Sequence, residues 1–279
     1  MVELIDARRE AAAGRPPRVS LIGWTRLWSR VAMMVLAALV TVPLHYLWRL
    51  FRLHSPWPRI FLGSVGRISG ARVSRVGTPL KHNVFYVSNH VSWIDILAIG
   101  GTSGSAFVAK REIGTAPIVG WLSTLNNTVF VSREDRLGVA AQINQLRDAI
   151  AENWAITVFP EGTTTDGRSL LPFKTPMLKV LEPPPPGVRV QPVLMDFGAV
   201  GEEIAWIGAE SGRDNAIRVL SRAGSFPVRV HFLEPFCPSA IAGRKAIAAE
   251  SRRLLTGALE GVLGEPLRPF AGHEALGAG

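Results

Sequence analysis

The chain has 279 residues, enough for one large domain or for a domain with an appendage. Hydrophobic residues make up 47% of it, but no series of long apolar segments is present, so the composition disfavours a multi-span membrane protein and favours a soluble body with a membrane-attached segment. The net charge of +9 indicates an anionic partner surface, and we expect a membrane and no nucleic acid, because the basic residues are scattered and no nucleic-acid-binding motif accompanies them.

The N-terminal part of the chain contains two kinds of sequence. Residues 1–20 carry several arginines and a Pro-Pro pair, and they are predicted to form a basic, flexible arm. Residues 21–75 are predicted to hold membrane-attachment helices, because an apolar run over 31–48 is flanked by arginines and tryptophans. Since both flanks are basic, the positive-inside rule gives no orientation, and we expect a helix or helix pair embedded from the cytoplasmic side in preference to a true span.

From about Val76 the pattern changes to short β-branched runs that alternate with helical stretches, which is typical of an α/β domain. Strands are predicted over 82–87, 105–109, 128–131, 155–159, 188–196 and 227–233. Helices are predicted over 93–99, 116–125, 137–153, 176–181, 213–221 and 241–263. The predicted fold is α/β: a mixed, largely parallel sheet flanked by helices over 76–270, with an N-terminal membrane-embedded helical segment and a tail at 271–279.

The stretch Asn89-His90-Val91-Ser92-Trp93-Ile94-Asp95 joins a predicted strand to a predicted helix. Residues five apart lie about 140° apart around a helix, so His90 and Asp95 face each other only if His90 lies on the turn and Asp95 in the first helical turns. In that arrangement the carboxylate orients the imidazole, whose free nitrogen can take a proton from an alcohol. For the pair alone, the alternative is a histidine that caps the helix and an aspartate in its first turn.

A second polar cluster follows another predicted strand end. The apolar run 155–159 leads directly into Pro160-Glu161-Gly162-Thr163-Thr164-Thr165-Asp166-Gly167. Ligands of open α/β sheets bind at the carboxyl ends of the strands. We therefore expect this cluster to share one site with His90 and Asp95.

Four segments together resemble the motifs of the glycerolipid acyltransferase family, which includes bacterial 1-acylglycerol-3-phosphate acyltransferases. The stretch from Asn89 to Asp95 resembles its NHxxxxD signature, and Phe159-Pro160-Glu161-Gly162-Thr163 resembles its FPEGT block. Thr128 to Arg133 is similar to the family's middle block, and Val190-Gln191-Pro192-Val193 is similar to its fourth, a strand centred on a proline. The four segments follow the family's order over about residues 81–198, so jointly they are specific.

Two positions depart from the family pattern. Many members have Arg after FPEGT, where this chain has Thr164, and the middle block often starts with Gly, where this chain has Asn127. The first departure removes a phosphate or head-group ligand and makes lysophosphatidate a less secure acceptor. The Thr-Thr-Thr-Asp-Gly run, with Glu203-Ile204-Ala205-Trp206 further on, resembles the branch that acylates lyso-ornithine lipid.

The resemblance implies transfer of a fatty acyl group from a thioester to the free hydroxyl of a lysolipid. His90 is the predicted base, and Asp95 is the residue that orients it. Arg133 is the predicted ligand of the acceptor's phosphate or carboxylate, because a guanidinium binds such groups through paired hydrogen bonds; the alternative for Arg133 is a surface salt bridge. The rest of the substrate pocket is predicted to be lined by Glu161, Gly162 and Thr163.

Competing uses of these residues lack support in the sequence. A metal at His90 and Asp95 needs further ligands, and no His/Cys cluster supplies them, so no metal is predicted. Neither a G-x-x-x-x-G-K-[ST] loop nor a G-x-G-x-x-G turn is present, and no organic cofactor is predicted. The alternative class is a non-catalytic membrane-surface protein that binds or carries lipid, although binding alone does not require a base.

The first candidate acceptor is 1-acyl-sn-glycerol-3-phosphate, acylated to phosphatidic acid, and the second is lyso-ornithine lipid. The resemblance implies that the acyl donor is a thioester of acyl carrier protein (acyl-ACP) or of coenzyme A (acyl-CoA). We expect the protein at the cell inner membrane, with its catalytic domain on the cytoplasmic side.

Overall fold

The computed structural model describes residues 8–115, 117–131, 144 and 155–270, and all structural statements refer to these ranges. The helix predicted over 137–153 lies outside them, apart from Asn144. The helices are α2 (Leu21–Leu50), α3 (Trp57–Ile68), α4 (Ile94–Ser103), α5 (Arg111–Gly114), α6 (Pro117–Leu125), α8 (Gly201–Ile204), α9 (Gly212–Ser221) and α10 (Gly243–Leu263), with 3-10 helices η1 (Pro176–Leu181), η2 (Gly198–Val200) and η3 (Pro238–Ala240). The strands are β1 (Ala71–Val76), β2 (Val84–Ser88), β3 (Ala106–Lys110), β4 (Val129–Val131), β5 (Ala155–Val158), β6 (Arg189–Asp196) and β7 (Phe226–Phe232).

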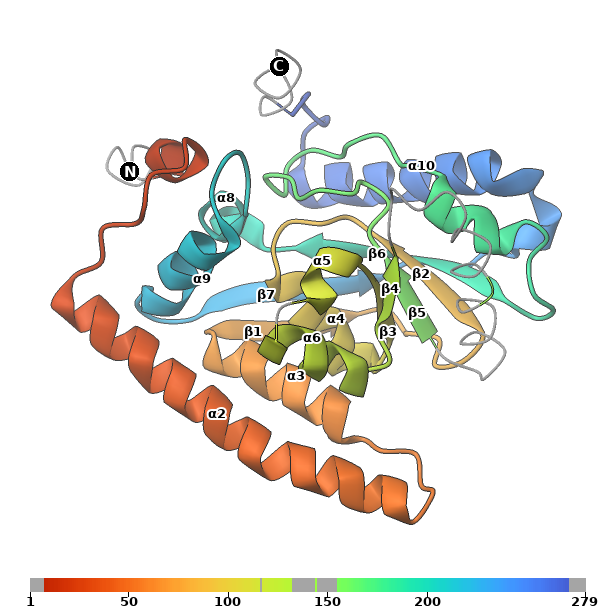
Figure 1. The fold of residues 1–279 in the computed structure, drawn as a ribbon. Coiled ribbons are helices and arrows are strands. Elements are labelled where there is room, and N and C mark those ends of the chain that lie inside the picture. The colour runs from red at the N-terminus through yellow and green to blue at the C-terminus, as the bar shows by residue number, and fades with distance from the viewer. Residues whose placement is uncertain (1–7, 116, 132–143, 145–154, 271–279) are drawn as a thin grey trace.

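The described strands form one sheet in the order β1-β7-β6-β2-β5-β3-β4 (Figure 1). All neighbouring strands are parallel except β6 and β7, which are antiparallel. The prediction of a mixed, largely parallel sheet flanked by helices is therefore confirmed. Because β2 and β5 are parallel neighbours, the turns that follow them lie at the same edge of the sheet.

Residues 71–76 form strand β1, whereas the sequence predicts that residues 71–75 belong to the helical membrane-attachment segment; this prediction is wrong. Strand β1 pairs with β7 from Ala71 opposite Phe226 to Val76 opposite His231, so the sheet begins at residue 71. Five of its six residues are exposed. An edge strand without a buried face lacks the alternation that marks a strand in sequence, which is why the pattern did not reveal it.

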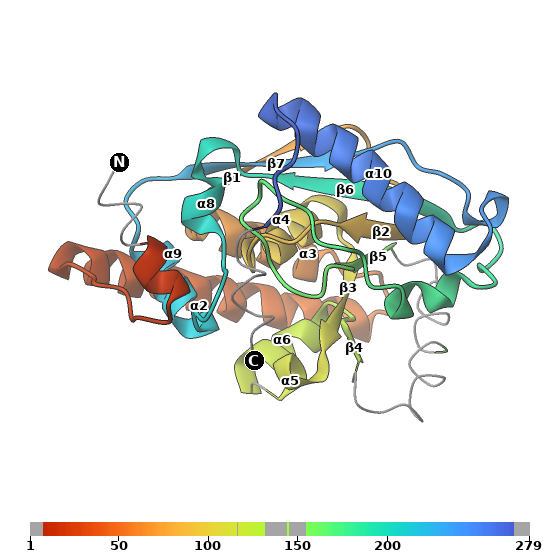
Figure 2. The ribbon, with the colours of Figure 1, turned by 90° about the horizontal axis from the view of Figure 1, so that it is seen from above.

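The central strand β2 is buried throughout and divides its side chains between two hydrophobic cores. Val84 and Tyr86 point into the core under α4, whereas Phe85 and Val87 point into the opposite core. Figure 2, seen from above, shows α10 lying across this second face of the sheet. A strand covered on both faces reads as a continuous apolar run, which explains why β2 was found from the sequence.

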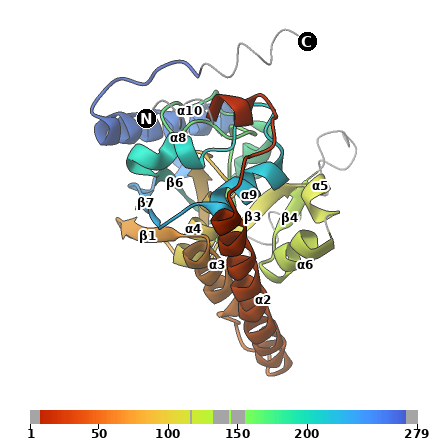
Figure 3. The same cartoon turned by 90° about the vertical axis from the view of Figure 1, so that its left-hand side faces the viewer.

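Helices α2 and α3 form a hairpin beside the α/β domain. Helix α2 has 30 residues, and by length and composition it is the one described helix able to cross a membrane. Only 11% of its most apolar 18-residue window is buried inside the protein. It nevertheless makes defined contacts with the domain: the guanidinium of Arg30 donates hydrogen bonds to the carbonyls of Val219 (3.3 Å) and Leu220 (2.8 Å) at the end of α9. Figure 3 shows α9 directly above α2.

The predicted flexible arm needs a correction in its described part. Residues 8–12 are helical, and the carbonyl of Ala12 accepts a hydrogen bond from the N–H of Ala209 (2.8 Å). Ala11 is only 3% exposed, and Arg8 forms an ion pair with Glu210 (3.5 Å). This part of the arm is therefore packed against the α/β domain, where Ala11 is buried and Arg8 pairs with a carboxylate.

Glycines bring α3 and α4 into close contact. A Cβ on Gly101 would lie 2.7 Å from Cα and 2.8 Å from N of Gly63, which is closer than real Cβ contacts. We expect Gly101→Ala to push the helices apart and lower the free energy of unfolding by about 1–3 kcal/mol. Gly261→Ala in α10 is the matched control, because no described heavy atom lies within 4 Å of the added Cβ. Urea unfolding in detergent checks this, and equal midpoints for the two variants would contradict the packing argument.

Candidate active site

Residues 89–93, here called the His90 turn, connect β2 to α4. Asn89 attaches this turn to β6: its side chain donates a hydrogen bond to the carbonyl of Met195 (3.2 Å) and accepts one from the Met195 N–H (2.7 Å). The Asn89 side chain is completely buried. The asparagine of the NHxxxxD stretch therefore continues the pairing of β2 with β6 past the end of the strand.

The structure brings His90 and Asp95 together as predicted. His90 Nδ1 lies 2.7 Å from Asp95 Oδ2, and Asp95 is completely buried in the first turn of α4. The same oxygen accepts the backbone N–H groups of Val91 (2.6 Å) and Ser92 (3.0 Å). One oxygen of Asp95 thus orients the imidazole and holds two backbone N–H groups of the His90 turn. Among the residues that the structure describes, no side chain caps the first turn of α4, so the alternative of a histidine that caps this helix is not realised.

The second ring nitrogen of His90 is placed to accept a proton. With Nδ1–H donated to Asp95, the neutral imidazole carries its lone pair on Nε2. The His90 side chain is 18% exposed, and its ring stacks on Phe159 with centroids 4.1 Å apart. The stacking and the carboxylate together fix the ring, which is the requirement for a general base.

Glu161 braces the His90 turn from the neighbouring strand end. One carboxylate oxygen accepts the N–H of His90 (2.9 Å) and the other accepts the N–H of Leu171 (2.8 Å). Burial raises the pKa of Glu161 to about 8, and the charge of Asp95 adds to the rise, while the two backbone hydrogen bonds oppose it. The predicted contact of Glu161 with the acceptor stays a prediction.

The remaining predicted pocket residues lie beside this brace. Gly162 adopts a positive φ of 74°, and Thr163 is exposed at the surface. The following residues contact the His90 turn through the backbone, since the N–H of Thr165 donates to the carbonyl of His90 (2.8 Å). Arg133, the predicted ligand of the acceptor's anionic group, lies outside the described residues.

Residues 201–215 form a side of the site that the sequence did not predict. The N–H of Trp206 donates to the carbonyl of Val91 (2.9 Å), and the hydroxyl of Thr164 donates to the carbonyl of Trp206. The indole N–H of Trp93 donates to Asn215 (3.0 Å). These partners are more than 40 residues apart in the chain, so no local pattern predicts their contact. The runs that contain Thr164 and Trp206 carry only the resemblance to the lyso-ornithine lipid branch. Within the described ranges, no group of three or more His, Cys, Asp or Glu residues is placed to hold a metal ion.

The protein-family model named Acyltransferase matches residues 68–196 of this chain, a range that contains His90, Asp95 and Glu161. Fold, site and this match together define the protein as an acyltransferase. The lyso-ornithine lipid O-acyltransferase of Brucella abortus is 31% identical over 262 residues, which cover 87% of this chain and 97% of that protein. The chain therefore belongs to the acyltransferase family.

Two further proteins that resemble this chain are enzymes named for a different acceptor. The 1-acyl-sn-glycerol-3-phosphate acyltransferase of Neisseria gonorrhoeae is 32% identical over 110 residues, 39% of this chain and 43% of that protein. The crystal structure of the 1-acyl-sn-glycerophosphate acyltransferase PlsC from Thermotoga maritima matches with a TM-score of 0.60 at 21% identity, covering 87% of this chain and 100% of that chain. The structural match supports the shared fold.

Proposed function

We propose that the protein transfers a fatty acyl group from a thioester to the free hydroxyl of a lysolipid, with His90 as general base. The observation that carries this proposal is the 2.7 Å contact between His90 Nδ1 and buried Asp95. The acceptor oxygen attacks the thioester carbonyl while its proton passes to His90 Nε2. The tetrahedral intermediate then expels the thiolate, which takes the proton from Nε2 and leaves as a thiol. Asp95 stabilises the imidazolium between these two steps.

Lyso-ornithine lipid is the proposed acceptor. Relatives named for this acceptor align over 87% and 86% of this chain, whereas the relative named for 1-acyl-sn-glycerol-3-phosphate aligns over 39%. Thr164, which stands where many family members have Arg, supports the same choice. The sequence motifs alone put 1-acyl-sn-glycerol-3-phosphate first, and it is retained as the second candidate because of the similarity to enzymes named for it.

The acyl donor, acceptor contacts and location complete the proposal. The donor is acyl-ACP or acyl-CoA. Arg133 binds the acceptor's phosphate or carboxylate, and Glu161, Gly162 and Thr163 line the same pocket. The protein lies at the inner membrane with its catalytic domain in the cytoplasm. The exposed apolar surface of α2, which includes Trp28, Leu36 and Leu39, supports attachment to a membrane.

The test is acyl transfer by the detergent-solubilised protein, with radiolabelled acyl-ACP and acyl-CoA each offered with both candidate acceptors. His90→Ala is expected to lower transfer by about 10²–10⁴-fold, since it removes the base. His231→Ala is the matched control, because His231 on β7 forms a second histidine–aspartate contact, 3.3 Å from Asp196 on β6. It should retain activity within about twofold of the wild-type rate. Transfer that survives in His90→Ala, or no product from any donor and acceptor pair, would refute the proposed function.

A further inference from the structure

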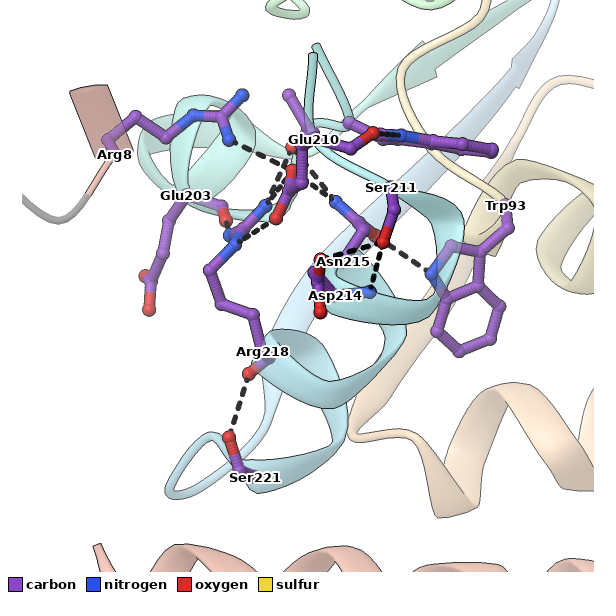
Figure 4. A network of polar contacts seen from close by, with 11 residues as sticks. Arg8, Trp93, Glu203, Glu210, Ser211, Asp214, Asn215, Arg218 and Ser221 are labelled. Carbon is purple, nitrogen blue, oxygen red and sulfur yellow. Dashed lines mark hydrogen bonds and ion pairs between the residues drawn. The ribbon is translucent and has the colours of Figure 1, made fainter. Parts of the chain in front are cut away.

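A buried polar network lies behind the His90 turn (Figure 4). Its centre is the carboxylate of Glu210, whose side chain is 1% exposed. Arg218 donates two hydrogen bonds to this carboxylate (2.8 and 3.0 Å), and Asn215 donates a third (3.0 Å). Arg8, from the docked part of the N-terminal arm, completes the group at 3.5 Å. A buried carboxylate with this many donors is held in one position.

Asn215 connects this network to the His90 turn. The Asn215 side chain is completely buried, its oxygen accepts the indole N–H of Trp93 (3.0 Å), and its nitrogen also donates to the carbonyl of Ala205 (3.3 Å). Its oxygen and nitrogen are therefore both used, and a buried amide is tolerated only when it is paired in this way. Figure 4 shows the Asn215 side chain directed at the edge of the Trp93 indole.

Trp93 is the residue through which α9 can act on the predicted catalytic pair. It lies between His90 and Asp95 in sequence and immediately precedes the first residue of α4. The backbone of the His90 turn is attached to β6 through Asn89, to the segment after β5 through Glu161 and Thr165, and to Trp206 through Val91. The Trp93 indole is the side chain that ties the turn to α9, so a shift of Trp93 moves the backbone that carries both His90 and Asp95.

We propose that Asn215 is a positioning residue for acyl transfer: by holding the Trp93 indole it fixes the His90 turn and the direction of His90 Nε2. The expected change in kcat rests on the proposed function. The expected change in the position of the His90 turn rests on geometry alone. A general base must lie within hydrogen-bond reach of the acceptor hydroxyl. A displacement of about 1 Å at such a site can lower the rate by about 100-fold.

The experiment compares two variants that each remove one buried side-chain hydrogen bond. Trp93→Phe breaks the bond to Asn215, whereas the control Ser69→Ala breaks the bond from the Ser69 hydroxyl to the carbonyl of Val65 (2.8 Å) at the end of α3. Both variants should lower the melting temperature by a few degrees. Only Trp93→Phe should lower kcat, by about 10-fold to 100-fold with KM unchanged. The control should keep kcat within about twofold of wild type.

A second readout is independent of substrate. The proton on His90 Nδ1, assigned by its loss in His90→Ala, is expected to give a downfield nuclear magnetic resonance signal in the wild type. This signal should broaden in Trp93→Phe and persist in Ser69→Ala. An unchanged signal in Trp93→Phe overturns the inference, whether or not the proposed acceptor is correct. An equal loss of kcat in both variants also overturns the inference. A rise in KM for Trp93→Phe at full kcat overturns it too, because that result would make Trp93 a contact of the acceptor.

Discussion

Asp95→Asn is expected to lower kcat by about 10²–10⁴-fold while the protein stays folded. The amide oxygen of the variant can take the place of Oδ2 and accept the same three donors, from His90, Val91 and Ser92. The amide nitrogen then takes the place of Oδ1, which has no partner among the described residues. Hydrogen bonds and tautomer are thus retained, and the charge that stabilises the imidazolium is lost.

Stability separates this electrostatic effect from a structural one. Asp95→Asn should change the free energy of unfolding by no more than about 2 kcal/mol, because one unpaired buried atom replaces another. Asp95→Ala should lower the free energy of unfolding by more than this, because it leaves two buried N–H donors without an acceptor, at a cost of about 1–3 kcal/mol each. Asp214→Asn removes the same charge from the first turn of α9 and serves as the control with normal turnover. Urea unfolding and steady-state kinetics on the three variants check the prediction, which fails if Asp95→Asn keeps wild-type kcat.

The parts of the site found from sequence share a physical property: each lies where a buried strand ends. The apolar runs of β2 and β5 are continuous because both faces of these strands are covered, so their ends are sharp in the sequence. His90 and Glu161 follow those ends directly. Parallel pairing of β2 with β5 then brings the two turns together, and this pairing follows from the α/β pattern.

The parts that were missed depend on contacts without a local pattern. Asn215 meets Trp93 across 122 positions of the chain, and Asn89 meets Met195 across 106. An amide side chain is polar in sequence whether it is buried or exposed, so residue type alone does not reveal such a contact. The bracing role of Glu161 was missed for a related reason, since both of its partners are backbone N–H groups, which every residue except proline carries.

Glu161 should make the stability of the protein fall as the pH rises above about 5. Its pKa is raised from 4.5 to about 8, so between these values the folded protein holds a proton that the unfolded chain has released. Unfolding then releases a proton, and higher pH favours it. The stabilisation is fully present below the unfolded pKa and declines by roughly 1.4 kcal/mol for each pH unit up to the folded pKa.

Glu161→Gln removes this titration and should flatten that part of the pH dependence. Urea midpoints measured between pH 5.5 and 8.5, about the range that the two pKa values bracket, should fall for the wild type and change less for the variant. Glu250→Gln is the control, because Glu250 pairs with Arg253 at the surface of α10 and its loss should leave the slope unaltered. Identical slopes for wild type and Glu161→Gln would show that burial does not protonate this carboxyl. A smaller slope in Glu161→Gln would assign the loss of stability at high pH to Glu161, which holds the His90 turn. Above its pKa the ionised Glu161 carboxylate lies in a buried site together with Asp95, and this destabilises the folded protein.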